Sequence, residues 1–427
     1  MRGLANLAEP LATFKLTLSI DDAFRYTPKI MMQTNMKQPV PQKKLHNGGR
    51  LMTHVLFVTT SFPDEAFQKG EEAAGGFVSD FAFGLAQYVK VTIVAPSKRN
   101  SVIQKRNLTI CRFAVSSLPL SHLKSHNPAH WPKIIKTLRS GQKAVMDVAR
   151  ETAVDHIFAL WALPSGYWAY RAKQQFNIPY SIWALGSDIW TLRRIPVVKN
   201  VLRNVLRNST NRFADGFLLA DDVKTISKLD CQFLPSSRKI GTSKVKKLAT
   251  KPPYRLAFLG RWHLNKGIDL LMESLKELYE DDWTKIETVK ICGGGPLEDV
   301  VKKSVSELQR DGYPVTLKGF LNRQKAAELL AWADYILLPS RIESIPVIFS
   351  DAMQMRCPIV TMPVGDLPRL MQTYGPGIMA SEISSQSFTN ALRVILEQSP
   401  ISFGPNIQKA CSAFKIESSV QQFLQSI

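Results

Sequence analysis

Short apolar runs recur along the chain from residue 54 onward, and most are followed by a stretch with helical spacing. The first run, HVLFV at residues 54–58, ends in a turn. A stretch with apolar residues four apart, at Phe77, Phe81 and Leu85, comes next, and a second apolar run covers residues 89–96. This alternation predicts β-α-β units with buried parallel strands.

The same alternation continues through both halves of the chain. We expect further strands at 157–161, 180–185 and 216–220 in the first half, and at 255–260, 288–293, 315–319, 334–338 and 358–361 in the second. Helical stretches separate the second-half strands, at 267–278, 297–309, 324–333 and 347–354. The pattern predicts an α/β protein with two Rossmann-like, doubly wound domains facing a central cleft, where ligands bind at the carboxyl ends of the strands.

A polar, basic segment with Gly and Pro-Pro, residues 238–254, separates the two halves and is expected to be an interdomain linker. We therefore expect one Rossmann-like domain over 52–237 and a second over 255–405. Residues 406–427 are expected to form a C-terminal helix that packs back toward the first domain. Residues 1–51 show no sustained hydrophobic period, so we expect a disordered or spurious extension, with Met52 as a natural start.

Charge is divided unevenly between the halves. Residues 1–255 carry 38 Lys and Arg against 16 Asp and Glu, whereas residues 256–427 carry 17 against 19. A one-sided positive field attracts polyanions such as nucleic acid, anionic lipid headgroups or phosphorylated substrates. A solvated basic surface without a particular partner explains the same charge equally well.

Composition excludes several classes of protein. No stretch approaches the roughly 18 apolar residues that a membrane-spanning helix needs. The N-terminus lacks the pattern of a secretory signal. The five cysteines are scattered and form no CxxC pair, which indicates reduced thiols in a cytoplasmic protein and not a disulfide framework or a zinc site.

Charged and glycine-rich segments follow the strands of the second half. Arg261 and Lys266 stand between a strand and a helix start, where free N–H groups also favour an anion such as a diphosphate. The turn at 293–296 lets backbone approach a ligand closely. Glu343 follows the next strand, and Asp351 comes eight residues later. Together these cations and acids suit a ligand that carries both a diphosphate and hydroxyl groups. The alternatives are that the two cations are simply solvated in their loop, that Glu343 caps the following helix, and that Asp351 lies on a solvated face.

The order of these segments resembles the nucleotide-binding half of retaining glycosyltransferases of the GT-B fold, specifically family 4. The motifs are GRxxxxKG at 260–267, GGGP at 293–296, PSxxExxP at 339–346 with an acid eight residues after its glutamate, and VGxLP at 364–368. In the first half, SFP at 61–63 with GGFV at 75–78, WALPSG at 161–166 and LGSDIW at 185–190 are similar to the family's glycine loop and later strand ends. The resemblance covers nearly all of residues 54–405.

The resemblance implies a role for each segment. Glu343 would meet the hydroxyls of the donor sugar, and Asp351 would accept hydrogen bonds from the ribose. Arg261 and Lys266 would stabilise charge on the departing diphosphate, so that these two and Glu343 form the catalytic set. The expected donor-binding residues are Gly260, Gly294, Gly295, Pro296, Val347, Ile348 and Asp351. The expected acceptor or phosphate loop contains Gly75, Gly76 and Asp188.

The implied reaction moves a hexose from a nucleotide diphosphate sugar to a hydroxyl of a glycan or lipid-linked acceptor, with retention at the anomeric carbon. The departing phosphate would take the acceptor's proton. No DxD or HEE motif stands where a metal would bind, so we expect no cofactor and no metal. The second acid is Asp351 where the family has Glu, and Leu185 stands where it often has His. These departures motivate one alternative, an inactive GT-B scaffold.

Two further alternatives remain. A basic nucleic-acid or polyanion binder would interleave aromatic residues with its basic runs, which are poor in them here, so no nucleic acid is expected. A GT-B-like epimerase or hydrolase would explain the spacings of Gly260 to Gly267 and of Glu343 to Asp351 less well than a transferase does.

Within 195–208, an apolar stripe lies opposite basic residues. It predicts a core-packed helix or, as the alternative, a helix that binds an anionic membrane surface and makes the protein peripheral on the cytoplasmic face.

Overall fold

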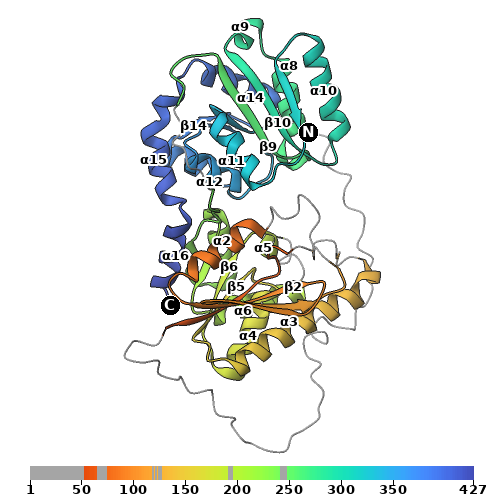
Figure 1. Cartoon of the computed structure of the whole chain (residues 1–427), viewed down its shortest axis with the longest axis vertical. Coiled ribbons are helices and arrows are strands. Elements are labelled where there is room, and N and C mark those ends of the chain that lie inside the picture. The colour runs from red at the N-terminus through yellow and green to blue at the C-terminus, as the bar shows by residue number, and fades with distance from the viewer. Residues whose placement is uncertain are drawn as a thin grey trace, which may run out of the picture.

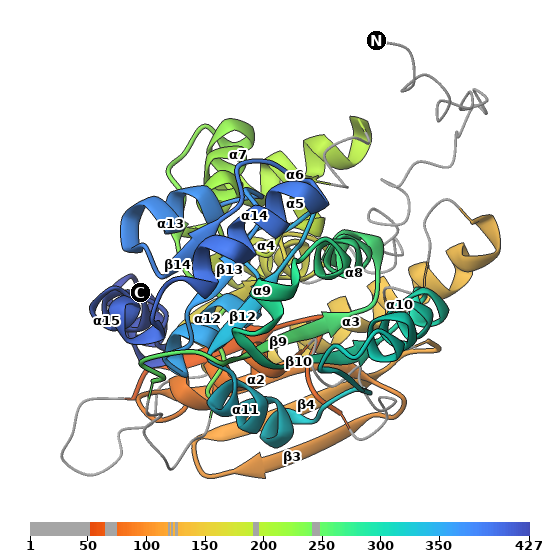
Figure 2. The same cartoon turned by 90° about the horizontal axis from the view of Figure 1, so that it is seen from above.

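The computed structural model describes residues 52–64, 75–117, 120, 123, 127–190, 196–240 and 248–427. The expected extension over 1–51 and part of the expected linker, 241–247, lie outside the described residues. Two α/β units are stacked along the long axis of the molecule (Figure 1). The view from above shows the C-terminal unit lying over the N-terminal one (Figure 2).

The N-terminal domain is built on one sheet with the order β3-β4-β2-β1-β5-β6-β7-β8. Neighbouring strands are parallel except for β3 and β4, which form an antiparallel edge hairpin. The strands are β1 (His54–Val58), β2 (Lys90–Ser97), β3 (Ser101–Lys105), β4 (Leu108–Ala114), β5 (His156–Leu160), β6 (Tyr180–Ala184), β7 (Arg212–Ala214) and β8 (Gln232–Phe233). The helices are α2 (Gly76–Leu85), α3 (Trp131–Glu151), α4 (Ser165–Phe176), α5 (Ser187–Trp190), α6 (Pro196–Asn208) and α7 (Phe217–Ser227).

The C-terminal domain has an all-parallel sheet with the order β11-β10-β9-β12-β13-β14. Its strands are β9 (Tyr254–Arg261), β10 (Ile286–Gly294), β11 (Val315–Lys318), β12 (Tyr335–Leu338), β13 (Ile359–Thr361) and β14 (Gly377–Met379). Its helices are α8 (Ile268–Lys276), α9 (Glu280–Trp283), α10 (Glu298–Arg310), α11 (Arg323–Trp332), α12 (Val347–Gln354), α13 (Leu367–Tyr374) and α14 (Ser385–Leu396). The central strands are buried on both faces, which is why they read as continuous apolar runs.

The C-terminal segment forms two helices, α15 (Gly404–Ala413) and α16 (Ile416–Gln425), which run down one side of both domains (Figure 1). Helix α15 packs on α12 and α13, and α16 packs on α2 of the first domain. The Phe423 ring is fully buried there and stacks on Phe158 of β5, with 4.1 Å between the ring centroids. The chain therefore returns to the N-terminal core before it ends, and α16 ties the two domains together.

The strand expected at 216–220 is wrong. The strand at this point of the sheet is β7, Arg212–Ala214, and residues 217–227 form helix α7. The apolar run was misleading because α7 buries Leu219, Ala220 and Val223, so one helical face carries the hydrophobic residues.

The amphipathic stretch at 195–208 forms α6, and the core-packed interpretation is confirmed. Val198, Leu202, Val205 and Leu206 are buried against the N-terminal domain. Because this apolar stripe lies in the core, it cannot also lie on a membrane, and the membrane-surface interpretation of this helix is wrong. None of the helices within the described ranges has the length and apolarity to cross a bilayer.

Candidate functional site

The loops predicted to carry chemistry meet at the carboxyl edge of the second sheet. Strands β9 and β10 are neighbours, with Gly260 opposite Gly293 and Arg261 opposite Gly294. Strand β12 pairs with the other side of β9, so the segment that follows it lies at the same edge. The parallel arrangement thus brings together segments that are about 80 residues apart in sequence.

The GGGP turn is tight because the neighbouring loop passes directly against it. Gly293 and Gly295 have φ values of 148° and 151°, which disfavour any other residue. A Cβ at Gly293 would lie 1.9 Å from the carbonyl oxygen of Gly260. Gly294 packs against the Phe320 ring, and Pro296 is exposed. The glycines are therefore required for the close packing of the GGGP turn against the neighbouring loop after β9.

Lys266 and Glu343 form an ion pair, which is the central feature of the site. The Lys266 ammonium donates to Oε1 of Glu343, which also accepts from Ser340 Oγ at 3.2 Å. Lys266 ends a short 3₁₀ turn, and Gly267 beyond it has a φ of 64°. A Cβ at Gly267 would lie 1.8 Å from the carbonyl oxygen of Pro339, so only glycine lets the two loops meet here.

Glu343 does not cap the following helix. Pro346 occupies the N-cap position of α12, and the helix begins at Val347, followed by Ile348. The Glu343 side chain is 12% exposed and that of Lys266 is 36% exposed, so the pair borders solvent. The free N–H groups at the start of α12 add partial positive charge to the same edge. Arg261, at the end of β9, has an exposed side chain.

Asp351 lies on α12 and is fully buried, so the interpretation that it lies on a solvated face is wrong. Its partner is Arg238, from the segment between the domains. The Nε of Arg238 lies 3.0 Å from Oδ1 and 2.8 Å from Oδ2, and its Nη2 also donates to Oδ2. Burial raises the pKa of Asp351, although the charge of Arg238 opposes this.

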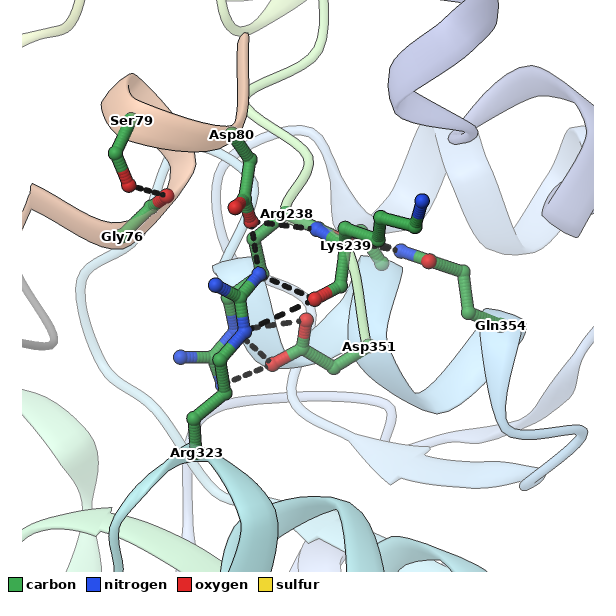
Figure 3. A network of polar contacts seen from close by, with 9 residues as sticks. Gly76, Ser79, Asp80, Arg238, Lys239, Arg323, Asp351 and Gln354 are labelled. Atoms are coloured by element: carbon green, nitrogen blue, oxygen red, sulfur yellow. Dashed lines mark hydrogen bonds and ion pairs between the residues drawn. The ribbon is translucent and has the colours of Figure 1, made fainter. Parts of the chain in front are cut away.

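The N-terminal domain contributes the glycine loop. Gly75 packs against Pro63, and a Cβ at Gly76, the first residue of α2, would meet nothing within 4 Å. Ser79 Oγ donates to the carbonyl oxygen of Gly76 at 2.9 Å, and Asp80 follows on the same helix (Figure 3). The start of α2 therefore lies near the Asp351 network.

Asp188 is buried, and backbone N–H groups occupy both of its oxygens. It accepts from Ala162 N at 2.6 Å and from Leu185 N at 3.2 Å. Burial raises the pKa of Asp188 to about 6, against the opposing effect of these hydrogen bonds. The carboxyl group joins the loops that follow β5 and β6, and its assignment to the acceptor loop remains a prediction.

A second set of carboxyl groups lies where α7 meets the other domain, and sequence reasoning did not identify it. Asp366, in the VGxLP loop, accepts from Leu218 N at 3.0 Å and thus caps a helix of the opposite domain. A Cβ at Gly216 would lie 2.1 Å from Ser344 Oγ and 2.5 Å from Asp366 Oδ2. Asp215 beside it is buried, and burial together with the charge of Asp188 raises its pKa to about 8.

Arg238, Arg323 and Asp80 were also missed. Arg238 is one of seven basic residues between Phe233 and Arg255, and nothing in that run distinguishes it. Within the described ranges, no group of three or more His, Cys, Asp or Glu side chains is arranged to hold a metal ion.

Comparison with known proteins agrees with this geometry. Residues 253–398 match the family model for glycosyl transferases group 1. The chain is 30% identical to the D-inositol 3-phosphate glycosyltransferase of Corynebacterium aurimucosum over 148 residues, and this aligned part covers 34% of this chain and 35% of that protein. It is 26% identical over 232 residues to the putative teichuronic acid biosynthesis glycosyltransferase TuaC of Bacillus subtilis, 52% of this chain and 56% of that protein. The chain thus spans between about a third and about half of the length of these curated relatives.

The fold extends the likeness to most of the chain. The structure of Anabaena HepE in complex with UDP and glucose superimposes with a TM-score of 0.60 at 15% identity, covering 88% of this chain and 99% of that one. At this identity the match concerns the fold alone. The protein therefore has the GT-B fold of two Rossmann-like domains, and most of its C-terminal domain matches the family model for glycosyl transferases group 1.

Proposed function

We propose that the protein is a retaining hexosyltransferase, which moves a sugar from a nucleotide diphosphate sugar to a hydroxyl of a glycan or lipid-linked acceptor. The observation that carries the proposal is the Lys266–Glu343 pair at the carboxyl edge of the second sheet, inside the segment that matches glycosyl transferases group 1. Support also comes from the relatives, whose names are those of glycosyltransferases, and from HepE, whose structure holds UDP and glucose.

The donor would lie along the edge formed by β9, β10 and α12. Lys266 and the exposed Arg261 would bind the diphosphate, together with the N–H groups at the start of α12. Glu343 has one oxygen engaged by Lys266 and Ser340, and its other oxygen would accept from a sugar hydroxyl. Asp351 would accept from the ribose.

The hard step is departure of the diphosphate from the anomeric carbon. As that bond breaks, negative charge grows on the leaving oxygen, and Arg261 and Lys266 would stabilise it. The acceptor hydroxyl would attack from the same face and pass its proton to the departing phosphate, which explains retention. Arg261 and Lys266 would supply at this position the charge stabilisation that a metal gives elsewhere, so we propose a metal-independent reaction without a cofactor.

The acceptor would lie against the basic N-terminal domain, near Gly75 and Gly76. Exposed cations on this domain, such as Lys133, Lys136 and Arg139 on α3, suit an anionic acceptor or the anionic cytoplasmic face of a membrane. We propose a cytoplasmic, peripheral location on this ground.

Titration calorimetry with UDP, GDP and ADP, followed by rate measurements with sugars of the nucleotide that binds, tests the function. Lys266→Ala and Arg261→Ala should each lower turnover about 10²- to 10³-fold, since each removes charge stabilisation of the leaving group. Lys276→Ala is the matched control, because Lys276 pairs with Glu307 on the surface of the same domain. Absence of binding for all three nucleotides, or full turnover in Lys266→Ala, would contradict the proposal.

A further inference from the structure

Asp351 is the acid expected to bind the donor's ribose, yet Arg238 already occupies both of its oxygens. The Asp351 side chain is 0% exposed and that of Arg238 is 16% exposed. Because no part of this carboxylate reaches solvent, a ribose hydroxyl can bond to it only if a neighbouring group moves, and Arg238 is the group that holds both oxygens (Figure 3).

The backbone next to Arg238 is held by both domains. Lys239 N donates to Asp80 Oδ2 on α2 at 2.7 Å, and the Lys239 carbonyl accepts from Arg323 Nε on α11 at 3.0 Å. The Arg323 Nη2 also bonds Asp80, which closes the ring of contacts (Figure 3). We call Asp80, Lys239 and Arg323 the interdomain clamp.

The C-terminal domain holds Arg238 itself from a second side. Gln354, one turn beyond Asp351 on α12, donates from Nε2 to the Arg238 carbonyl at 2.9 Å. The backbone of Arg238 and Lys239 is therefore held from both sides, while the guanidinium reaches Asp351 through the Arg238 side chain. The pair and the interdomain clamp are linked through charge, because Arg323 of the clamp also acts on the Asp351 carboxylate.

The Arg238–Asp351 pair is also one that a ligand can replace. A buried pair has little net stability compared with an apolar pair, but a buried carboxylate left without donors is costly, so a ligand that displaces Arg238 must supply donors of its own. The raised pKa of Asp351 indicates that burial outweighs the attraction of Arg238 at this site. A ribose offers two hydroxyl donors to the same carboxylate, without a second charge to desolvate.

We propose that Arg238 is a positioning residue that competes with the donor's ribose for Asp351, so that donor binding displaces Arg238 and loosens the interdomain clamp. The inference rests on the proposed function, since it takes Asp351 as the ribose ligand. It assigns to Arg238 a role in discriminating ribonucleotides, because only a ligand with ribose hydroxyls gains from displacing it.

The test compares two ligands of the full chain by calorimetry. They are the nucleoside diphosphate that the wild type binds most tightly among UDP, GDP and ADP, and its 2′,3′-dideoxy analogue. The readout is the ratio of the dideoxy to the ribo dissociation constant. Arg238→Gln removes the competing charge and should raise this ratio about five- to tenfold, by tightening the ribonucleotide alone. Arg238→Lys, which restores a cation, should return the ratio toward that of the wild type.

Arg323→Ala keeps both Arg238 and Asp351, weakens the interdomain clamp and removes a second positive charge that acts on Asp351, so it should raise the same ratio about two- to threefold. Lys276→Ala should leave the ratio unchanged. The inference is overturned if the wild type binds a nucleotide but neither Arg238→Gln nor Arg323→Ala changes the ratio, or if both ligands tighten equally. Absence of any nucleotide binding to the wild type would instead remove the proposed function, and this inference with it.

Discussion

Two of the contacts between the domains differ in how they treat buried charge. At the paired seam, defined by Asp80, Arg238, Arg323 and Asp351, each carboxylate has a guanidinium partner. At the carboxyl seam, Asp366 of one domain lies near Asp215 of the other, and backbone and hydroxyl groups are their hydrogen-bond partners. One oxygen on each of these two residues lacks a hydrogen-bond partner within the described part of the chain.

This difference implies that the stability of the two seams depends on different variables, the facing cations at one and the pH at the other. The paired seam depends on the cations that face its carboxylates, because removing one of them leaves a buried carboxylate without a charge partner. Burial raises the pKa values of Asp215 and Asp366, as it does that of Asp351, but Asp351 faces a guanidinium whereas the partners of Asp215 and Asp366 are backbone and hydroxyl groups, so a proton can neutralise them instead. Substitution of a cation should therefore disturb the first seam, and a change of pH should disturb the second.

The largest effect should follow from removing the buried cation of the paired seam. Arg238→Met leaves Asp351 buried without a charge partner and should lower the free energy of unfolding by about 3–5 kcal/mol. The double variant Arg238→Met/Asp351→Leu removes both charges and should recover most of that loss. Urea unfolding of the three proteins measures this, and equal losses in the single and double variants would show that charge pairing is not what the seam depends on.

The ion pair of the site was predictable from sequence, whereas the seams were not. Lys266 and Glu343 follow neighbouring parallel strands, and such strands end at one edge of a sheet, so spacing alone brings them together. Asp80 and Lys239 meet although 159 residues separate them, and only the packing of two whole domains decides that contact. The prediction of a strand at 216–220 was wrong for a related reason, because a short apolar run has the same appearance in sequence whether it belongs to a buried helix face or to a strand.

The carboxyl seam should make stability depend on pH between about 6 and 8. Asp215 has a pKa of about 8 in the folded chain against an ordinary value near 3.8, so it keeps its proton on folding and releases it on unfolding. Its contribution is complete below the ordinary value and is lost as the pH rises toward 8. Above the pKa of Asp188, about 6, the slope should be about 1.4 kcal/mol per pH unit.

Asp215→Asn cannot titrate and should flatten this slope, as measured by urea midpoints at pH 6, 7 and 8. Neighbouring groups modulate the slope. Asp188 and Asp366 oppose ionisation of Asp215, and Asp221 opposes ionisation of Asp366, whereas Arg369, which stacks on Phe217, favours ionisation of Asp366. Asp147→Asn, on the surface of α3, is the control and should keep the slope of the wild type. An unchanged slope in Asp215→Asn would mean that the proton resides elsewhere.

The smallest effect should come from the outer contact of the paired seam. The Arg323 side chain is 47% exposed, so solvent screens its attraction to Asp80. Arg323→Ala should therefore lower the free energy of unfolding by only about 0.5–1 kcal/mol, and the difference should shrink between 0.05 M and 0.5 M salt. Urea unfolding at both salt concentrations measures it, with Lys302→Ala, which breaks an exposed pair within α10, as the control. A loss of unfolding free energy as large as that of Arg238→Met, and independent of salt, would show that the Arg323–Asp80 pair is as shielded from solvent as the Arg238–Asp351 pair. The contrast between buried and exposed pairs in this seam would then be wrong.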